Sequence, residues 1–302
     1  MPENVFHPFS TGALGLFPTV MLHAAIAGYV IAAVMALAAL FAPARARMAW
    51  ADAAAAISTG ALLAYFLSRF ISAGMAPFSS LFEVMALSAL ALASAYHVAA
   101  RTRRFPSMGA FALPAVALTL LVSLPVAGSV DRGADQPAGA LTAMHVLLTV
   151  LANGALVMAS VAAGMFLMQE RALRRHHTPR IVRHFPPLEA LRRLLAQCVW
   201  VGLPLLTVGL ALGFASRPPS QWGVLLATPK VMSALMLWAV FAAAVFGKAA
   251  GWLHGRRHSY LILAGFALVV LTYAALGLFV SQAGGDAGAV SQAPGGPAWP
   301  RT

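Results

Sequence analysis

Long apolar runs separated by short polar segments dominate the hydropathy pattern of this chain. The runs cover residues 14–41, 51–73, 79–100, 106–127, 141–168, 194–216, 230–250 and 260–282. Runs of roughly 20 apolar residues are long enough to cross a hydrocarbon core of about 30 Å as helices. In lipid the backbone must satisfy its own hydrogen bonds, which an α-helix does within one segment. The pattern therefore predicts an all-α, polytopic transmembrane helical bundle of about eight spans.

Basic residues are concentrated in alternate connections between these runs. They lie in segments 45–47, 101–104, 170–193 and 248–257, whereas the intervening loops and both tails carry few. Cytoplasmic loops of membrane proteins carry an excess of lysine and arginine. The alternation predicts that the basic loops are cytoplasmic and that both termini lie outside. We expect a multi-pass protein of the bacterial inner (plasma) membrane.

The composition excludes a soluble globular domain. Hydrophobic residues make up 61% of the 302 residues, charged residues only 9%, and the mean hydropathy is +0.82. Soluble domains carry about 25% charged residues. The net charge of +12 resides in the short basic loops, which predicts contact with anionic membrane lipid and no nucleic-acid binding. Cys198 is the single cysteine, which excludes an internal disulfide and CxxC chemistry.

We expect residues 1–282 to form one transmembrane domain. Residues 283–302 are rich in glycine, proline and alanine, which predicts a disordered external tail. The longest cytoplasmic loop, 170–193, is interpreted as a solvated anchor on anionic lipid. His254 and His258 lie in another basic loop and are expected to be solvated.

Two histidines fall at similar predicted depths near the outer face. His23 lies two to three turns into the first span, and His145 lies about one turn into the fifth. Two neutral imidazoles from different helices are able to hold the iron of a porphyrin axially. The alternative is that each histidine forms a hydrogen bond to a neighbouring helix. The two interpretations are about equally supported by the residues.

Further polar and aromatic residues are predicted at the same side. Arg69 ends the second span, Glu83 begins the third, and Trp222 and Lys230 precede or open the seventh. A cation there would pair with haem propionates, and the tryptophan would pack on the macrocycle. Alternatively, Arg69 and Glu83 neutralise one another as a buried ion pair that fixes helix packing. The chain has no Walker, HExxH, GxSxG or paired-carboxylate motif, so we assign it no catalytic residues and expect no catalysis of its own.

Several segments resemble the CcsA-type cytochrome c assembly family over roughly residues 55–282. Residues 74–83 (GMAPFSSLFE) are similar to the family segment "G..P..N.YES", and His145 opens the matching segment HVLLTVLANGALVMASVAAGMFL. The family's tryptophan-rich external loop reads approximately "WG..W.WDPKE". Trp222, Gly223, Pro229 and Lys230 fit it, but Ala227 and Thr228 stand about where Trp and Asp belong. This degenerate motif resembles the HemX/YpjD-like branch.

The resemblance implies that the chain binds, presents or passes haem b at the outer face in support of cytochrome c assembly. It matches His145 to the first external haem-ligating histidine, whereas the usual partner histidine is absent and Phe246 replaces the inner histidine. His23 is the candidate second ligand on depth alone. Implied partners are haem and other cytochrome assembly proteins or apocytochrome c. The alternative is a haem-free structural or regulatory membrane protein of the same fold.

Overall fold

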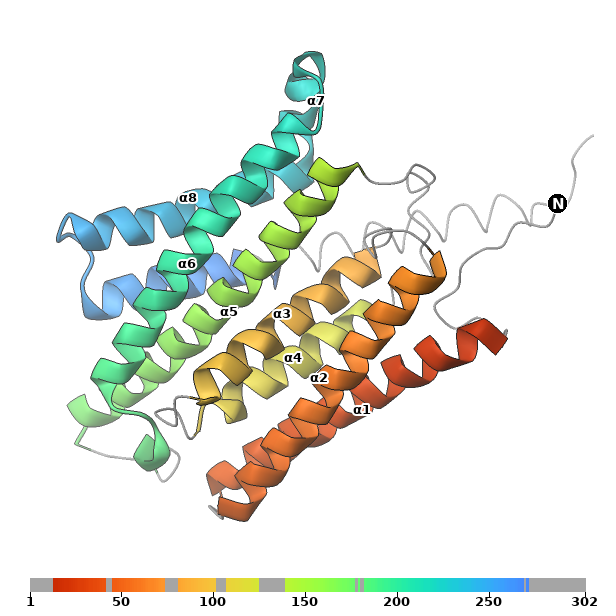
Figure 1. Cartoon of the computed structure of the whole chain (residues 1–302). Coiled ribbons are helices and arrows are strands. Elements are labelled where there is room, and N and C mark those ends of the chain that lie inside the picture. Colours follow the sequence, from red (N-terminus) through yellow and green to blue (C-terminus); the bar gives the residue numbers. More distant parts are fainter. Residues whose placement is uncertain are drawn as a thin grey trace, which may run out of the picture.

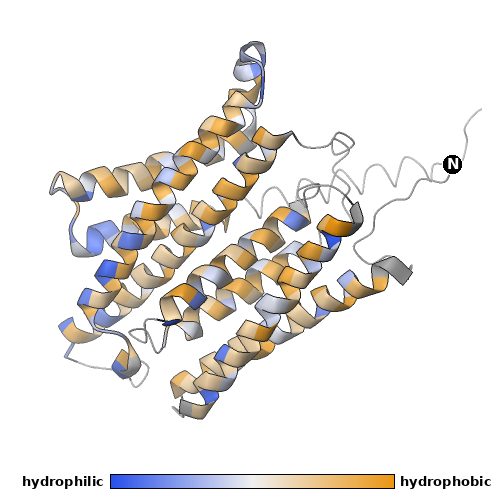
Figure 2. Ribbon diagram, viewed as in Figure 1, coloured by the Kyte–Doolittle hydropathy of each residue, from blue (hydrophilic) through white to orange (hydrophobic). Residues whose placement is uncertain are grey.

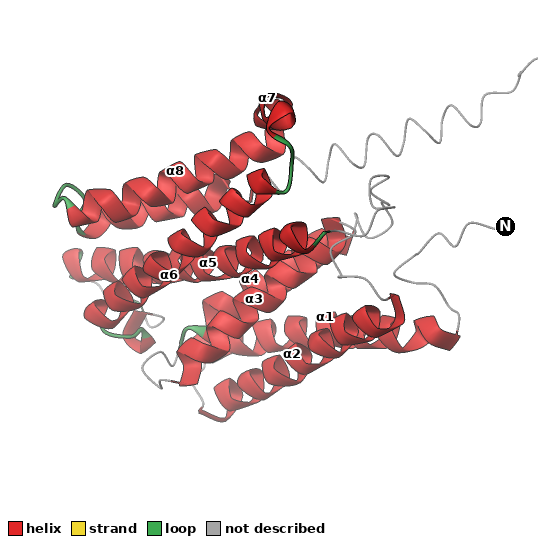
Figure 3. Ribbon diagram, turned by 45° about the horizontal axis from the view of Figure 1, so that its top comes forward, coloured by secondary structure: helices red, strands yellow, loops and turns green. Residues whose placement is uncertain are grey.

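The computed structural model describes residues 13–41, 45–73, 81–101, 107–124, 139–176, 179, 182–268 and 270–271, and the regular structure within these ranges is helical (Figures 1 and 3). The α-helices are α1 (Ala13–Phe41), α2 (Arg45–Ala73), α3 (Leu81–Arg101), α4 (Gly109–Ser123), α5 (Ala140–Arg174), α6 (Leu188–Ala215), α7 (Trp222–Ala227) and α8 (Pro229–Ala249), with short 3-10 turns η2 (Val182–His184) and η3 (Pro219–Gln221). A further helix runs over residues 255–268.

The predicted all-α membrane bundle is confirmed. Among the described helices, six are long and apolar enough to cross a membrane: α1, α2, α3, α5, α6 and α8. Apolar residues cover most of their surfaces (Figure 2). Helix α4 has 15 residues and is about 22 Å long at 1.5 Å per residue, shorter than the predicted 106–127 span. Much of the eighth predicted span and the whole predicted tail, 283–302, lie outside the described residues.

Several helices extend beyond the apolar runs that predicted them. Helix α2 begins at residue 45 and not 51, α5 continues to residue 174, and α6 begins at residue 188 and not 194. The apolar run marks only the part of a helix that lies in lipid, whereas backbone hydrogen bonding continues into water. Charged pairs one turn apart support these extensions: Arg174 Nη2 lies 2.9 Å from Glu170 Oε1, and Arg193 Nε lies 3.0 Å from Glu189 Oε1.

Helices α1 to α4 pack around a core of small and aromatic side chains. The alanines at positions 25, 32, 36, 51, 55, 86, 89 and 93 are fully buried, and so are Tyr29 and Phe82. Small residues allow helix backbones to approach closely in a membrane, where no hydrophobic effect drives helices together. At the α1–α2 contact, a Cβ on Gly28 would meet the Ser58 hydroxyl. Glycine therefore fits this contact without displacing the serine side chain.

A row of glycines on α6 sets the packing of α5. Cβ atoms added to Gly202, Gly209 and Gly213 would each lie 2.8 Å from a side-chain atom of α5, those of Leu156, Thr149 and His145 respectively. The partners descend along α5 by the same spacing, seven and then four residues, as the glycines ascend along α6. The two helices are therefore antiparallel in one register, with spacings typical of a left-handed helix pair.

A similar close contact joins α1–α4 to α5 and the helices that follow it. A Cβ on Gly154 of α5 would lie 2.8 Å from the backbone carbon of Ala91 in α3. On the other side of α6, Trp238 Nε1 of α8 donates a hydrogen bond of 2.9 Å to Thr207 Oγ1. The helices thus form a continuous chain of contacts from α1 to α8.

Alternate helix ends gather at opposite ends of the bundle. The last turns of α1, α3 and α5 and the first turns of α2, α4 and α6 lie at the lower left of Figure 1, and the opposite ends lie toward the upper right. The lower-left end is the one whose connections are rich in arginine. The structure therefore places the basic connections at a common end, which we predict to be cytoplasmic.

One of the two histidines predicted to be solvated after α8 is buried in the structure. His254 is exposed, but His258 is only 6% exposed, so the expectation that both are solvated is wrong for His258. Burial and the nearby Lys248 ammonium lower the pKa of His258 to about 4, against a smaller opposing effect of its backbone hydrogen bond at Ala244. The helix beginning at residue 255 packs onto α8, which the apolar pattern alone does not reveal.

Candidate functional site

His145 lies against α6 at the predicted outer end of the α5–α6 pair. Its Nδ1 atom is 2.6 Å from the carbonyl oxygen of Gly209. Its ring covers Gly213, where an added Cβ would lie 2.8 Å from Nδ1 and Cε1. The two glycines thus provide both the hydrogen-bond acceptor and the space that the imidazole occupies.

This contact selects one form of the imidazole. A carbonyl oxygen only accepts hydrogen bonds, so Nδ1 carries the proton and donates it. Nε2 then keeps its lone pair in the neutral ring. Metal-ligating histidines are commonly held in this way, with the other ring nitrogen donating to a carbonyl or carboxylate. The donor set at His145 therefore fits ligation of a haem iron through Nε2.

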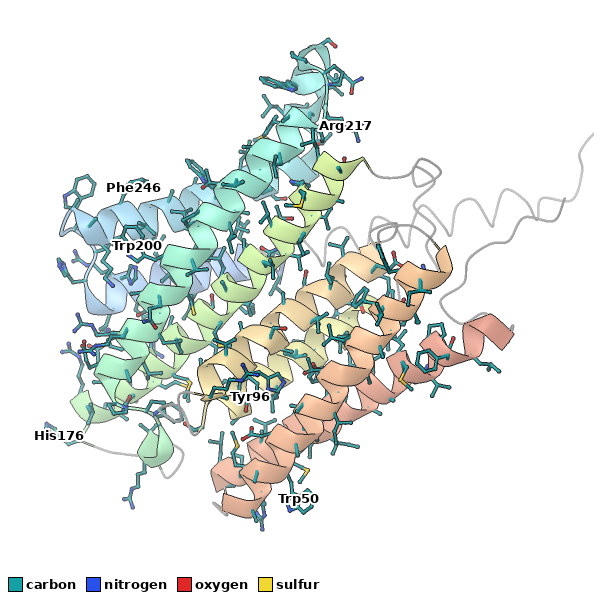
Figure 4. The ribbon with its side chains drawn as sticks, viewed as in Figure 1. Trp50, Tyr96, His176, Trp200, Arg217 and Phe246 are labelled. Atoms are coloured by element: carbon teal, nitrogen blue, oxygen red, sulfur yellow. The ribbon has the colours of Figure 1, made fainter. Side chains whose placement is uncertain are left out.

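Trp222 is brought to the same end of α6 by the turn that follows this helix. Its indole Nε1 lies 3.2 Å from the carbonyl oxygen of Phe214 and 3.3 Å from that of Arg217. The Trp222 and Phe214 rings meet edge to face with centroids 5.9 Å apart. Phe214 directly follows Gly213, which contacts His145. The last turn of α6 therefore links the histidine to half-buried Phe214 and exposed Trp222. Arg217, whose carbonyl contacts the Trp222 indole, lies at this end of α6 (Figure 4).

Arg69 and Glu83 form an ion pair between the end of α2 and the start of α3. Arg69 Nη2 and Nε lie 2.5 Å and 3.1 Å from Glu83 Oε1. The Glu83 side chain is 2% exposed and that of Arg69 16% exposed. Of the two interpretations drawn from sequence, the structure contains the ion pair that fixes helix packing.

The structure does not bring His23 to His145. His23 is exposed on α1, and its Nδ1 lies 2.7 Å from the carbonyl oxygen of Thr19, one turn earlier in the same helix. Helix α1 packs on α2 and α4, whereas α5 packs on α3 and α6. Figures 1 and 3 both show α3 and α4 between α1 and α5. A shared haem between the two histidines thus stays a prediction without a contact to support it. Lys230 begins α8, and its side chain lies outside the described atoms.

A second group of hydrogen-bonded polar side chains, contributed by α1, α2 and α3, lies between these helices. Thr59 Oγ1 of α2 is 2.8 Å from both Tyr29 Oη and His97 Nε2. Nearby, the Tyr96 hydroxyl donates to an Asp52 carboxylate oxygen. His97 therefore bonds inside the bundle, and these bonds satisfy polar groups that would otherwise be costly in lipid.

The role of α6 in the site was not predicted from sequence. Gly209 and Gly213 are spaced by one helical turn, and small residues at that spacing are a signal of close helix packing in membranes. The spacing does not say which helix packs there or which residue it presents. That information required the register between α5 and α6.

Comparisons with known proteins show the family to which this chain belongs. A family model described as Cytochrome C assembly protein matches residues 78–281. The cytochrome c biogenesis protein CcsA of Guillardia theta is 27% identical over 230 residues, which are 68% of this chain and 75% of that protein. An uncharacterized 28.8 kDa protein in the nifR3-like 5′ region of Azospirillum brasilense is 26% identical over 130 residues, which are 43% of this chain and 48% of that protein. No solved structure matches. The matched region contains α5, α6 and the segment with Trp222, and this chain belongs to the cytochrome c assembly protein family.

Proposed function

We propose that this protein binds haem b at the outer end of the α5–α6 pair through His145 and presents or passes it to partners in cytochrome c assembly. Family membership supports a role in cytochrome c biogenesis. The observation that carries the haem proposal is the hydrogen bond from His145 Nδ1 to the Gly209 carbonyl oxygen. This bond leaves Nε2 as the free ligand atom of the neutral imidazole.

Haem is the cargo in this proposal, and the chain's own residues hold and orient it. The Gly209 carbonyl fixes the tautomer and the orientation of the His145 ring. The edge-to-face pair of Phe214 and Trp222 offers an apolar wall at the same end of α6. Arg217, exposed beside this pair, is placed to attract an acidic propionate.

The other predicted site residues have different roles in this proposal. The Arg69 guanidinium is already engaged by Glu83, so it would have to leave a buried carboxylate in order to bind a propionate. We therefore assign Arg69 and Glu83 to helix packing. His23 remains the proposed second axial ligand only on predicted depth, and Lys230 remains a proposed contact from its place at the start of α8. We propose the bacterial inner membrane as the location, with apocytochrome c or other assembly proteins as partners.

A haem-free structural or regulatory role is the second candidate. Two observations favour it: the closed Arg69–Glu83 pair, and the bonding of the Trp222 indole to backbone carbonyls of its own loop. A tryptophan held in this way stabilises the loop without any ligand. In this case the outer end of α6 would serve as a rigid surface for a partner protein.

Visible spectra of the detergent-purified protein, oxidised and dithionite-reduced, test the proposal. We expect Soret absorbance in the wild-type protein from haem-replete cells and its loss in His145→Gly. Added imidazole should restore binding to this variant, because it replaces the missing ligand without repairing anything else. His23→Gly, examined in the same way, decides whether the second ligand comes from α1.

His254→Gly is the matched control, since His254 is exposed at the opposite end of the bundle. It should retain the wild-type spectrum. Absence of Soret absorbance in the wild-type protein even after haem supplementation would reject the haem proposal in favour of the second candidate. Equal loss in His145→Gly and His254→Gly would show that the spectrum reports folding and not ligation.

A further inference from the structure

An open hollow lies at the arginine-rich end of the bundle, away from His145. It occupies about 590 Å³ between the end of α5 and residues 252–260, which comprise the turn after α8 and the start of the helix over residues 255–268. Its lining residues are mainly basic and aromatic: Glu170, Arg174, Trp252, His254, Gly255, Arg256, Arg257 and Tyr260. A hollow of this volume is in the range of small-molecule sites.

Glu170 organises the arginines around the hollow. Its Oε1 lies 2.9 Å from Arg174 Nη2, and its Oε2 lies 3.9 Å from Arg256 Nε. The lining holds three arginines and a single carboxylate, so positive charge remains in excess after these pairs are formed. Arginine presents a planar set of donors that matches two oxygens of a phosphate. The chemistry of the lining therefore favours a phosphate group.

A hydrogen bond fixes the aromatic side of the hollow. Arg171 Nη2 donates to the Tyr260 hydroxyl at 2.6 Å, which ties the end of α5 to the helix over residues 255–268. The connection between α8 and this helix turns at Gly251 and Gly255, whose φ angles are +79° and +50°. Left-handed backbone of this kind suits glycine. The turn places Trp252 at the rim.

The aromatic residues indicate the depth of the hollow relative to lipid. Trp252 is 79% exposed and Tyr260 40% exposed. Tryptophan and tyrosine are enriched at membrane–water interfaces, at the level of the lipid headgroups. The apolar spans α5 and α8 end immediately beside these residues. The hollow thus opens where phospholipid phosphates lie.

We propose that this hollow binds the phosphate headgroup of an anionic phospholipid, such as phosphatidylglycerol. The excess of arginine selects an acidic headgroup over a zwitterionic one, and the exposed Trp252 lies beside the acyl chains. This site lies at the opposite end of the bundle from His145, so it does not depend on the proposed function.

Native mass spectrometry of the full chain tests this proposal. The protein is reconstituted with equal amounts of phosphatidylglycerol and phosphatidylcholine, released in detergent, and scored for retained lipid. We expect one phosphatidylglycerol to be retained per chain. In Arg174→Gln/Arg256→Gln its affinity should fall about tenfold, the scale of losing charge-assisted hydrogen bonds.

The matched control is Arg192→Gln/Arg193→Gln. These two arginines are also exposed at the same end of the bundle, and both lie near Glu189, but they do not line the hollow. Their replacement should change retention less than twofold by the same reasoning. Equal loss in both double variants would overturn the proposal, because it would show diffuse attraction to basic loops.

A single substitution separates binding from folding. Arg257 lines the hollow but, among the described residues, joins neither ion pair of Glu170, so Arg257→Gln should lower retention without lowering the melting temperature. Unchanged retention in this variant and in Arg174→Gln/Arg256→Gln would reject the site. Occupation by inorganic phosphate with no lipid retained would also reject it, since the occupant would then be a soluble anion. The spectra that test His145 are unaffected by any of these outcomes.

Discussion

Replacing Arg69 alone should lower the folding stability more than replacing Arg69 and Glu83 together. The Glu83 side chain is 2% exposed, and its Oε1 atom accepts hydrogen bonds from both Nε and Nη2 of Arg69. Arg69→Met would leave the carboxylate buried without its main cation. Removal of one partner from a buried pair costs about 3 to 5 kcal/mol of folding free energy.

The opposite change should be milder. In Glu83→Met the Arg69 guanidinium loses the Glu83 carboxylate, but its side chain is 16% exposed and is able to reach water at the helix end. We expect a loss of about 1 to 3 kcal/mol. In Arg69→Met/Glu83→Met, no charge is stranded, and replacement of a buried pair by apolar residues is often nearly neutral. The double variant should therefore be more stable than Arg69→Met.

Reversible unfolding in mixed micelles, followed by circular dichroism, measures the four free energies of unfolding in this cycle. The expected coupling energy is at least about 2 kcal/mol, well above the roughly 0.5 kcal/mol scatter of independent sites. If the two single losses simply add in the double variant, the ion pair does not hold α2 to α3. In that case Arg69 would become available for a ligand role.

Three further predictions concern packing, pH and topology. Gly154→Val should destabilise the protein by about 1 to 3 kcal/mol because the valine side chain would meet the backbone of α3. The control Gly164→Ala should be neutral or slightly stabilising, because no atom lies within 4 Å of the added Cβ. Thermal melting in detergent compares the two variants. Burial and a neighbouring lysine hold the pKa of His258 at about 4, so between pH 6.5 and 4 the unfolded chain binds more protons than the folded chain. The free energy of unfolding should therefore fall by up to about 3 kcal/mol as the pH falls through that range. The variant His258→Gln should lose this pH dependence. In a cysteine-free background, Ser220→Cys should react with an impermeant maleimide in intact cells and Arg175→Cys only after lysis; the reverse pattern would invert the predicted topology.

Hydropathy was sufficient to predict the helices but not their partners. Each apolar run carries its own signal of about 20 residues, and the helices formed where the runs lie. His145 and Gly209 are 64 residues apart in sequence, and their pairing depends on the register between α5 and α6. Many side chains outside the pair decide that register. Depth in the membrane grouped His145 with His23 because depth is one coordinate, whereas ligation requires proximity in three. The ion pair of Arg69 was predicted as an alternative because opposite charges near the same helix ends have a strong reason to meet.

A main-chain atom, and not a side chain, holds the imidazole of His145. Substitutions at position 209 leave a carbonyl there, so mutation of that residue removes the histidine's acceptor only by moving the helix. Sliding α5 along α6 by two residues shifts it about 3 Å, which would lengthen the 2.6 Å bond to about 4 Å, beyond hydrogen-bonding distance. In the proposed haem site, the orientation of Nε2 would therefore depend on the alignment of two helices. A partner that pushes on either helix would be able to weaken or restore the grip on a bound group without touching it.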